Sequence, residues 1–155
     1  MELESMVQNL TSIHKEMLLS PEDRFDATDS TLIQRFCSTI NKQLVRIIDW
    51  AKQLPGYCNL TVQDQAILLQ AAWVDLLVLN WVYQSLQAEH ERVRLSIMFS
   101  LTLQEAKDFG FEEIYSYISS LAVRAKKYNI AVEEISCLKA INLTNAGKIN
   151  DFIEI

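Results

Sequence analysis

The chain has 155 residues, half of them hydrophobic, with only three glycines and two prolines and a formal net charge of −6. So few glycines and prolines favour long helices over a sheet protein, which needs frequent turns. The apolar content is too high for a disordered chain. The largest basic cluster, Arg124 with Lys126 and Lys127, is too small to bind the phosphates of a nucleic acid. We therefore expect a helical domain that makes no direct contact with nucleic acid.

The three cysteines, Cys37, Cys58 and Cys137, are far apart in the sequence and odd in number. They form no CxxC pair and no cluster with histidine, so the sequence predicts neither a metal site nor a bound cofactor. We expect buried or half-buried reduced thiols, as in an intracellular protein. The N-terminal residues form an acidic amphipathic stretch, which is not typical of a signal peptide.

Hydrophobic residues at helical spacing predict a first helix over residues 3–18. The pair Ser20-Pro21 is expected to end it, because the residue before a proline disfavours helical backbone. The polar, acidic segment 21–30 is predicted to be a loop.

Two further helices have start and stop signals. Asp29 or Ser30 is expected to cap the second helix, and the sequence Leu54-Pro55-Gly56 to end it. Thr61 is expected to cap the third helix, with Asp64 three residues later as a variant of the capping box.

The third helix is apolar on nearly every side from Ala66 to Val82. A helix of this kind lies inside a larger fold or inside a membrane. Gln70, Asp75 and Asn80 interrupt the apolar stretch, which argues against a membrane span. The sequence therefore predicts a central helix between layers of other helices.

Beyond a charged turn at 89–94, residues 95–103 are mostly apolar, with serine and threonine among them, and predict a short pair of strands. A fourth helix is predicted over about 111–128. Its inward-facing residues are expected to be Ile114, Ile118, Leu121, Ala122 and Ala125.

A fifth helix is predicted over about 132–145, with Gly147 as its stop signal and no regular element in 148–155. One of its faces carries the residues that we expect to be buried: Ile135, Leu138, Ile141 and Asn142.

Residues suited to catalysis are scarce. Neither His14 nor His90 has a serine or cysteine partner in a recognisable nucleophile arrangement, and there is no glycine-rich phosphate loop. The acidic pairs at 112–113 and 133–134 are placed where helices start, where they favour the helix dipole. The sequence thus favours a binding role and predicts that the chain is not an enzyme.

The stretch from Gln43 to Leu86 carries a long, position-specific pattern, QLVRIIDWAKQLPGYCNLTVQDQAILLQAAWVDLLVLNWVYQSL. It contains WAK-x-x-PG-aromatic, then L-T-x-x-DQ-x-x-LL-x-x-x-W, and resembles the signature of nuclear receptor ligand-binding domains. A later stretch, EEISCLKAINLTNAG at 133–147, is similar to another helix of the same family. The resemblance covers about residues 32–147, with a weaker start at 3–19, and is strongest to the estrogen-related and estrogen receptors.

The resemblance implies an all-α fold, a partial three-layer helical sandwich, with residues 1–155 forming a single truncated domain in which Trp73 is a core anchor. It implies a nuclear protein that regulates transcription, without a membrane segment. The family's final activation helix, the helix that forms most of its dimer interface and its zinc-finger domain are not recognisable. A dimer partner is therefore expected only for a complete form. The alternative is a helical adaptor, or a dominant-negative fragment, that binds partners without ligand switching.

The resemblance also places a ligand pocket. Its lining residues here are Phe36, Ile40, Gln43, Leu77, Trp81 and Gln84. Gln84 stands where steroid-binding relatives have an arginine, which replaces a charged donor with a neutral amide. Ile40 and Trp81 are larger than the residues of those relatives. We expect a small or filled pocket that binds a lipophilic ligand weakly or not at all.

A coregulator groove carries over as well. In the family, short LxxLL helices dock between the end of the second helix and the start of the third. The matching residues are Ile48, Lys52, Gln65, Ala66, Leu69 and Gln70. Lys52 is expected to cap the carbonyl groups at the C-terminal end of the docked helix, where a cation is favourable.

Overall fold

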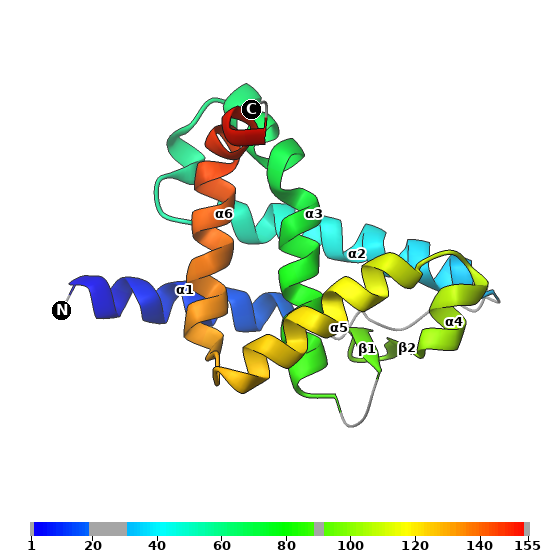
Figure 1. The fold of residues 1–155 in the computed structure, drawn as a ribbon. Coiled ribbons are helices and arrows are strands. Elements are labelled where there is room, and N and C mark those ends of the chain that lie inside the picture. The colour runs from blue at the N-terminus through cyan, green and yellow to red at the C-terminus, as the bar shows by residue number, and fades with distance from the viewer. Residues whose placement is uncertain (1, 19–30, 89–91, 154–155) are drawn as a thin grey trace. The chain divides into compact units, whose positions relative to one another are not determined.

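The computed structural model describes residues 2–18, 31–88 and 92–153 of the chain. Its elements follow one another as α1 (Glu2–Leu18), α2 (Leu32–Lys52), the 3₁₀ helix η1 (Tyr57–Asn59), α3 (Val62–Leu86), β1 (Val93–Ser96), β2 (Phe99–Leu101), α4 (Leu103–Asp108), α5 (Glu112–Lys127) and α6 (Val132–Ile153) (Figure 1). The fold is therefore all-α with one small sheet, as predicted. The expected loop at 21–30 lies outside the described residues.

The chain divides into two compact units. The first consists of Met1–Leu19, Leu44–Leu77 and Ala131–Ile155, and the second of Ser20–Gln43 and Val78–Ile130. That residues 1–155 form a single domain, as the family resemblance implies, stays a prediction.

The first unit is built from α1, the end of α2, the start of α3 and α6. Helix α1 packs against α6, and the two are seen together in Figure 1. Apolar side chains from all four helices fill the interior: Leu10, Ile13, Ile47, Trp50, Leu76, Ile135 and Leu143. Burial of side chains of this size stabilises a fold by roughly 1.5–3 kcal/mol each.

The second unit contains the start of α2, the end of α3, the two strands, α4 and α5. Strands β1 and β2 are antiparallel, with Val93 opposite Leu101 and an irregularity between Arg94 and Ser96. Both α4 and β1 contact α5. The buried apolar residues at these contacts are Val93, Leu95, Leu101, Ala106, Tyr115 and Ile118. The strand pair predicted at 95–103 is thus present, beginning two residues earlier.

Three helices begin at a threonine. The Thr61 hydroxyl accepts a hydrogen bond from the backbone of Asp64 at 3.1 Å, as predicted for α3. Asp29 and Ser30, the expected caps of α2, lie outside the described residues, and Thr31 caps this helix instead. Its hydroxyl accepts from the Gln34 backbone at 3.2 Å, while the Gln34 side chain accepts from the Thr31 backbone at 3.0 Å. This reciprocal pair is a capping box.

Helix α4 is not among the helices predicted from the sequence. This short helix starts with a second capping box, in which Thr102 and Glu105 exchange side-chain to backbone hydrogen bonds. The signature T-x-x-E is visible in the sequence, but six residues are too few to produce a helical periodicity.

Helices α5 and α6 correct several predicted details. Ile114 is 44% exposed, and Tyr115 is buried in its place. On α6, Leu138 and Ile141 are exposed, whereas Lys139 is fully buried. Hydrophobic spacing alone does not say which neighbouring helix covers which face, and this explains the misassigned residues. Helix α6 also continues past Gly147 to Ile153, so the predicted stop is wrong. A glycine inside a helix costs about 1 kcal/mol relative to alanine, which a longer helix tolerates.

Helix α3 is, by length and composition, apolar enough to cross a membrane. The central helix of a helical protein meets the same criterion, so this property is weak evidence by itself. Asn80 and Gln84 are both buried on this helix, which favours a protein interior. The expectation for Trp73 is wrong, because its side chain is 39% exposed. It lies on a face of α3 that the described part of the first unit leaves open.

Candidate functional site

Five of the six predicted pocket residues belong to the second unit. Gln43, Trp81 and Gln84 are buried there, while Phe36 and Ile40 are half-buried. Helix α2 contributes three of the five residues and α3 the other two. The sixth predicted residue, Leu77, belongs to the first unit, where it is 2% exposed.

The side chain of Gln43 is hydrogen-bonded at both ends of its amide group. Its oxygen accepts from the Trp81 indole N–H at 2.7 Å, and its nitrogen donates to the backbone carbonyl of Leu95 at 2.5 Å. These bonds link α2, α3 and β1 through one neutral side chain. A buried polar group is costly without partners, so this chain of bonds favours one fixed rotamer of Gln43 and of Trp81.

Further aromatic rings pack beside Trp81. The Phe36 ring lies 4.7 Å from Phe111, 5.5 Å from Phe109 and 6.4 Å from Trp81, measured between centroids. Phe109 and Phe111 are stacked on one another at 5.6 Å. The edge-to-face and stacked contacts are the favourable geometries for such rings. The four rings therefore form a packed cluster, named here the aromatic cluster.

The sequence analysis did not name Phe109 and Phe111. They come from the turn before α5, where Gly110 takes a left-handed backbone with φ of 79°. This conformation is unfavourable for residues with a Cβ atom. The sequence Phe-Gly-Phe could have indicated a turn with two aromatic rings. Only the fold, however, brings these rings against α2 and α3.

The six residues of the predicted coregulator groove all belong to the first unit. Ile48 and Lys52 are one turn apart near the end of α2 and are exposed. Gln65, Ala66, Leu69 and Gln70 lie on the first turns of α3, where Leu69 is half-buried and Ala66 exposed. Ile48 and Lys52 are neighbours on one face of α2, and Ala66, Leu69 and Gln70 share one side of α3. The groove itself stays a prediction.

Gln65 has a structural role at this surface. Its side-chain nitrogen donates to the carbonyls of Tyr57 and Leu60, at 3.2 Å and 3.1 Å. The Tyr57 hydroxyl donates back to the Gln65 carbonyl at 2.8 Å. Burial, and then the neighbouring Cys58, raise the pKa of Tyr57, which keeps the hydroxyl protonated as a donor. These bonds fasten η1 to α3.

Lys52 is the cation of the predicted groove. Its ammonium lies 3.9 Å from the Asp49 carboxylate, and both side chains are more than half exposed. An exposed pair of this kind contributes about 0–1 kcal/mol, so the ammonium is available for a stronger partner. The Lys52 carbonyl accepts a hydrogen bond from the Cys58 thiol. Cys58 and Cys37 are exposed free thiols, and only Cys137 is half-buried as predicted.

A group of three or more histidine, cysteine or acidic residues suited to a metal ion does not occur in the part of the chain that the structure describes. Residues 22–154 match the family model for the ligand-binding domain of nuclear hormone receptors. The chain belongs to this family.

Curated proteins that are similar to this chain are receptors of the same family. The receptor domain is 31% identical over 148 residues to the steroid hormone receptor ERR2 of Mus musculus, which covers 95% of this chain and 34% of the relative. It is 32% identical over 130 residues to the estrogen-related receptor gamma of Homo sapiens, covering 84% and 28%. The estrogen receptor of Danio rerio is 30% identical over 123 residues, covering 77% and 21%. The chain thus spans about a third or less of each of these relatives.

Among solved structures, the receptor domain is similar to the ultraspiracle ligand-binding domain of Drosophila melanogaster, with a TM-score of 0.76 and 27% sequence identity. The match covers 88% of this chain and 63% of that one. The relatives are receptors, so the receptor domain is not an enzyme.

Proposed function

We propose that this receptor domain regulates transcription in the nucleus by binding LxxLL-type coregulators, and that its interior is closed to steroid ligands. Membership of the nuclear hormone receptor family supports the first part. We assign dimerisation with a second receptor only to a complete form of the receptor.

The observation that carries the closed interior is the double hydrogen bond of Gln43. A steroid-type ligand would need a free polar group to hold its head, and both ends of this amide are already bonded to Trp81 and Leu95. The aromatic cluster lies beside the same side chains. To admit a ligand, the domain would have to break two buried hydrogen bonds, at a cost of roughly 1–3 kcal/mol for each unsatisfied group.

Charge supports the same proposal. Gln84 is buried and neutral, so a ligand head with partial negative charge would find no guanidinium at this position. A lipophilic ligand without a polar head would have to open this interior. Its volume would have to replace the ring of Trp81 or Phe111.

A peptide titration tests coregulator binding. We expect a labelled LxxLL peptide to bind the domain, and Lys52→Ala and Leu69→Arg each to weaken binding by about tenfold, the first through the lost carbonyl cap and the second through a charge in an apolar contact. Lys127→Ala and Val123→Arg are matched controls on α5, outside the predicted groove. If all four variants bind the peptide as tightly as the unmodified domain does, the groove assignment is wrong.

A ligand titration tests the closed interior. We expect no measurable estradiol binding by the unmodified domain, and binding of small apolar molecules by the double variant Ile40→Ala with Trp81→Gly, because the removed side chains leave a cavity. Tight estradiol binding by the unmodified domain would contradict the proposal. A change in LxxLL affinity on ligand addition would distinguish a ligand-regulated receptor from a helical adaptor.

A further inference from the structure

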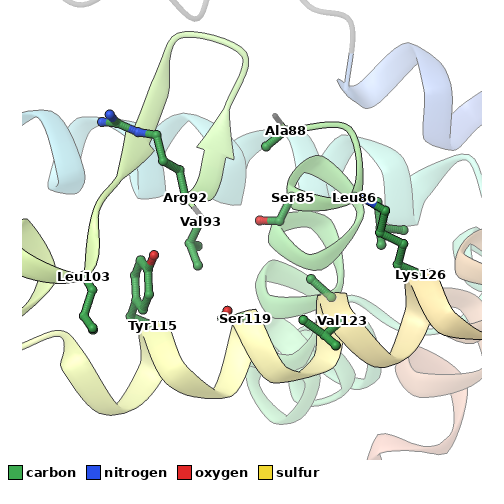
Figure 2. A pocket seen from close by; sticks show the side chains of 11 residues that line it. Ser85, Leu86, Ala88, Arg92, Val93, Leu103, Tyr115, Ser119, Val123 and Lys126 are labelled. Carbon is green, nitrogen blue, oxygen red and sulfur yellow. The ribbon is translucent and has the colours of Figure 1, made fainter. Parts of the chain in front are cut away.

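A groove in the second unit lies between the end of α3, strand β1 and α5 (Figure 2). Its free volume is about 500 Å³, within the range of small-molecule sites. None of the six predicted pocket residues lines it. We infer that this groove is a second ligand site and that it takes a long-chain carboxylate, a molecule with one apolar tail and one anionic head.

The walls of the groove favour an apolar tail. Leu86, Val93, Leu103, Ala122 and Val123 line it from four different elements. Leu103 and Val123 are 42% and 67% exposed, so much of their surface is in contact with water. Covering apolar surface stabilises a complex by roughly 25 cal/mol per Å², and a concave wall lets a flexible chain contact several of these side chains at once.

The ends of the groove favour an anionic head. Figure 2 shows Lys126 beside Leu86 at one end and Arg92 beside Val93 toward the other. Arg92 is already engaged, because its guanidinium donates to the Ser100 hydroxyl at 3.1 Å and lies 3.6 Å from the Glu105 carboxylate. No acid of residues 2–17, 31–88 or 92–145 forms a salt bridge with Lys126. Its ammonium is therefore available to a carboxylate.

The overall charge makes this preference selective. The chain has a net charge of −6, which repels anions in general. Only an anion that also gains apolar contacts is expected to overcome this repulsion and reach Lys126. A neutral alcohol with the same tail would lack the charge-assisted hydrogen bond, and an alkyl ammonium would be repelled by Lys126.

Calorimetry on the 155-residue chain tests the inference. The probes are dodecanoate, dodecanol and dodecyltrimethylammonium, each below the concentration at which it aggregates. We expect dodecanoate to bind at least tenfold more tightly than dodecanol, and the ammonium probe to bind more weakly than both. Lys126→Met should weaken dodecanoate binding about tenfold, whereas the neighbouring Lys127→Met, which removes the same charge outside the groove, should not.

A second pair of variants tests the position of the tail. Ala122→Trp fills the groove and should abolish binding, whereas Ser120→Trp adds the same ring to an exposed position outside it. Amide shifts of the unmodified chain provide a measurement without any substitution, and those that move with dodecanoate should cluster at Leu86, Val93 and Ala122. Moved shifts at Phe36, Trp81 and Phe111 would place the probe in the aromatic cluster and overturn the inference.

Three further results would also overturn it. These are equal affinity for dodecanol and dodecanoate, unchanged dodecanoate binding in Lys126→Met, and binding only to phosphatidylglycerol vesicles with none to monomeric dodecanoate. The last result would assign the groove to a membrane surface. None of these outcomes bears on LxxLL binding, so the inference stands or fails independently of the proposed function.

Discussion

The two units of this receptor domain have interiors of opposite character. In the second unit, the aromatic cluster is packed from four rings, and its Trp81 donates to Gln43, whose neutral amide is bonded at both ends. In the first, Lys139 is fully buried, with its ammonium 3.1 Å from Nδ1 of His14 and 4.4 Å from the ring centroid of Trp50. No carboxylate of the described residues forms a salt bridge with this lysine. The stability of the second unit therefore depends on the volume that its rings fill. The stability of the first unit depends on the protonation of Lys139 and His14.

The electrostatics of the first unit follow from burial. Burial lowers the pKa of Lys139 well below its usual value. Burial, then the charges of Lys139 and Lys15, lower the pKa of His14 to about 3. A protonated Lys139 donates to Nδ1 of a neutral imidazole, and the tautomer of His14 sets which group donates when the lysine is neutral. Cation–π contact with Trp50 and a contact of 3.5 Å with the Met17 sulfur replace part of the hydration of the ammonium.

The largest expected effect on stability comes from the loss of side-chain volume at Trp81. Trp81→Ala should lower the free energy of unfolding by about 3–5 kcal/mol, because it leaves a cavity and removes the partner of Gln43. Trp73→Ala is the matched control, and its cost should be about 1 kcal/mol because the ring is 39% exposed. Urea denaturation followed by circular dichroism measures both. Equal losses would mean that the aromatic cluster is not a packed interior.

Removal of the buried amino group of Lys139 should change the free energy of unfolding in the opposite direction. Lys139→Met is expected to raise the free energy of unfolding by about 1–4 kcal/mol at neutral pH, because an apolar side chain of similar length avoids the desolvation of an ammonium. The exposed Lys127→Met should change it by less than about 0.5 kcal/mol. The gain should shrink toward pH 10, where the lysine also loses its proton in the unfolded chain. A destabilised Lys139→Met at neutral pH would show that the cation–π contact outweighs the desolvation cost.

The pH dependence has a defined sign. The pKa of His14 is about 3 in the folded state, against 6.5 when exposed, so unfolding takes up a proton between these values. Stability is therefore complete above pH 6.5 and falls as the pH decreases toward 3, by up to about 1.4 kcal/mol per pH unit. Denaturation midpoints at a series of pH values measure this slope. His14→Gln should flatten it, and an unchanged slope would assign the acid sensitivity to another group.

The smallest expected effect on stability concerns the helix caps, which are of the same kind in both units. Thr31 begins α2 in the second unit and Thr61 begins α3 in the first, with the same hydroxyl to backbone hydrogen bond. Replacement of either residue by alanine should cost about 1 kcal/mol, because a helix cap is a local interaction. Ser116→Ala, on an exposed face of α5, is the control. Clearly different costs for the two caps would mean that each unit's interior influences its helix ends.

Much of this architecture was readable from the sequence. Hydrophobic periodicity located α1 and α5 to within a residue or two, and Thr61 marked the start of α3. The motif from Gln43 to Leu86 indicated the family, which residues 22–154 confirm. These features depend on neighbours within a few positions along the chain, and local sequence determines such interactions.

Only the tertiary structure decided the rest. It brought Phe109 and Phe111 against Phe36, paired Gln43 with Trp81, and left Trp73 exposed. It also buried Lys139, which any local reading places at the surface, since lysine is almost never fully buried. Each of these outcomes depends on which helix face meets another element far along the chain. Such pairings are set by packing and desolvation over the whole unit, and no local pattern of residues specifies them.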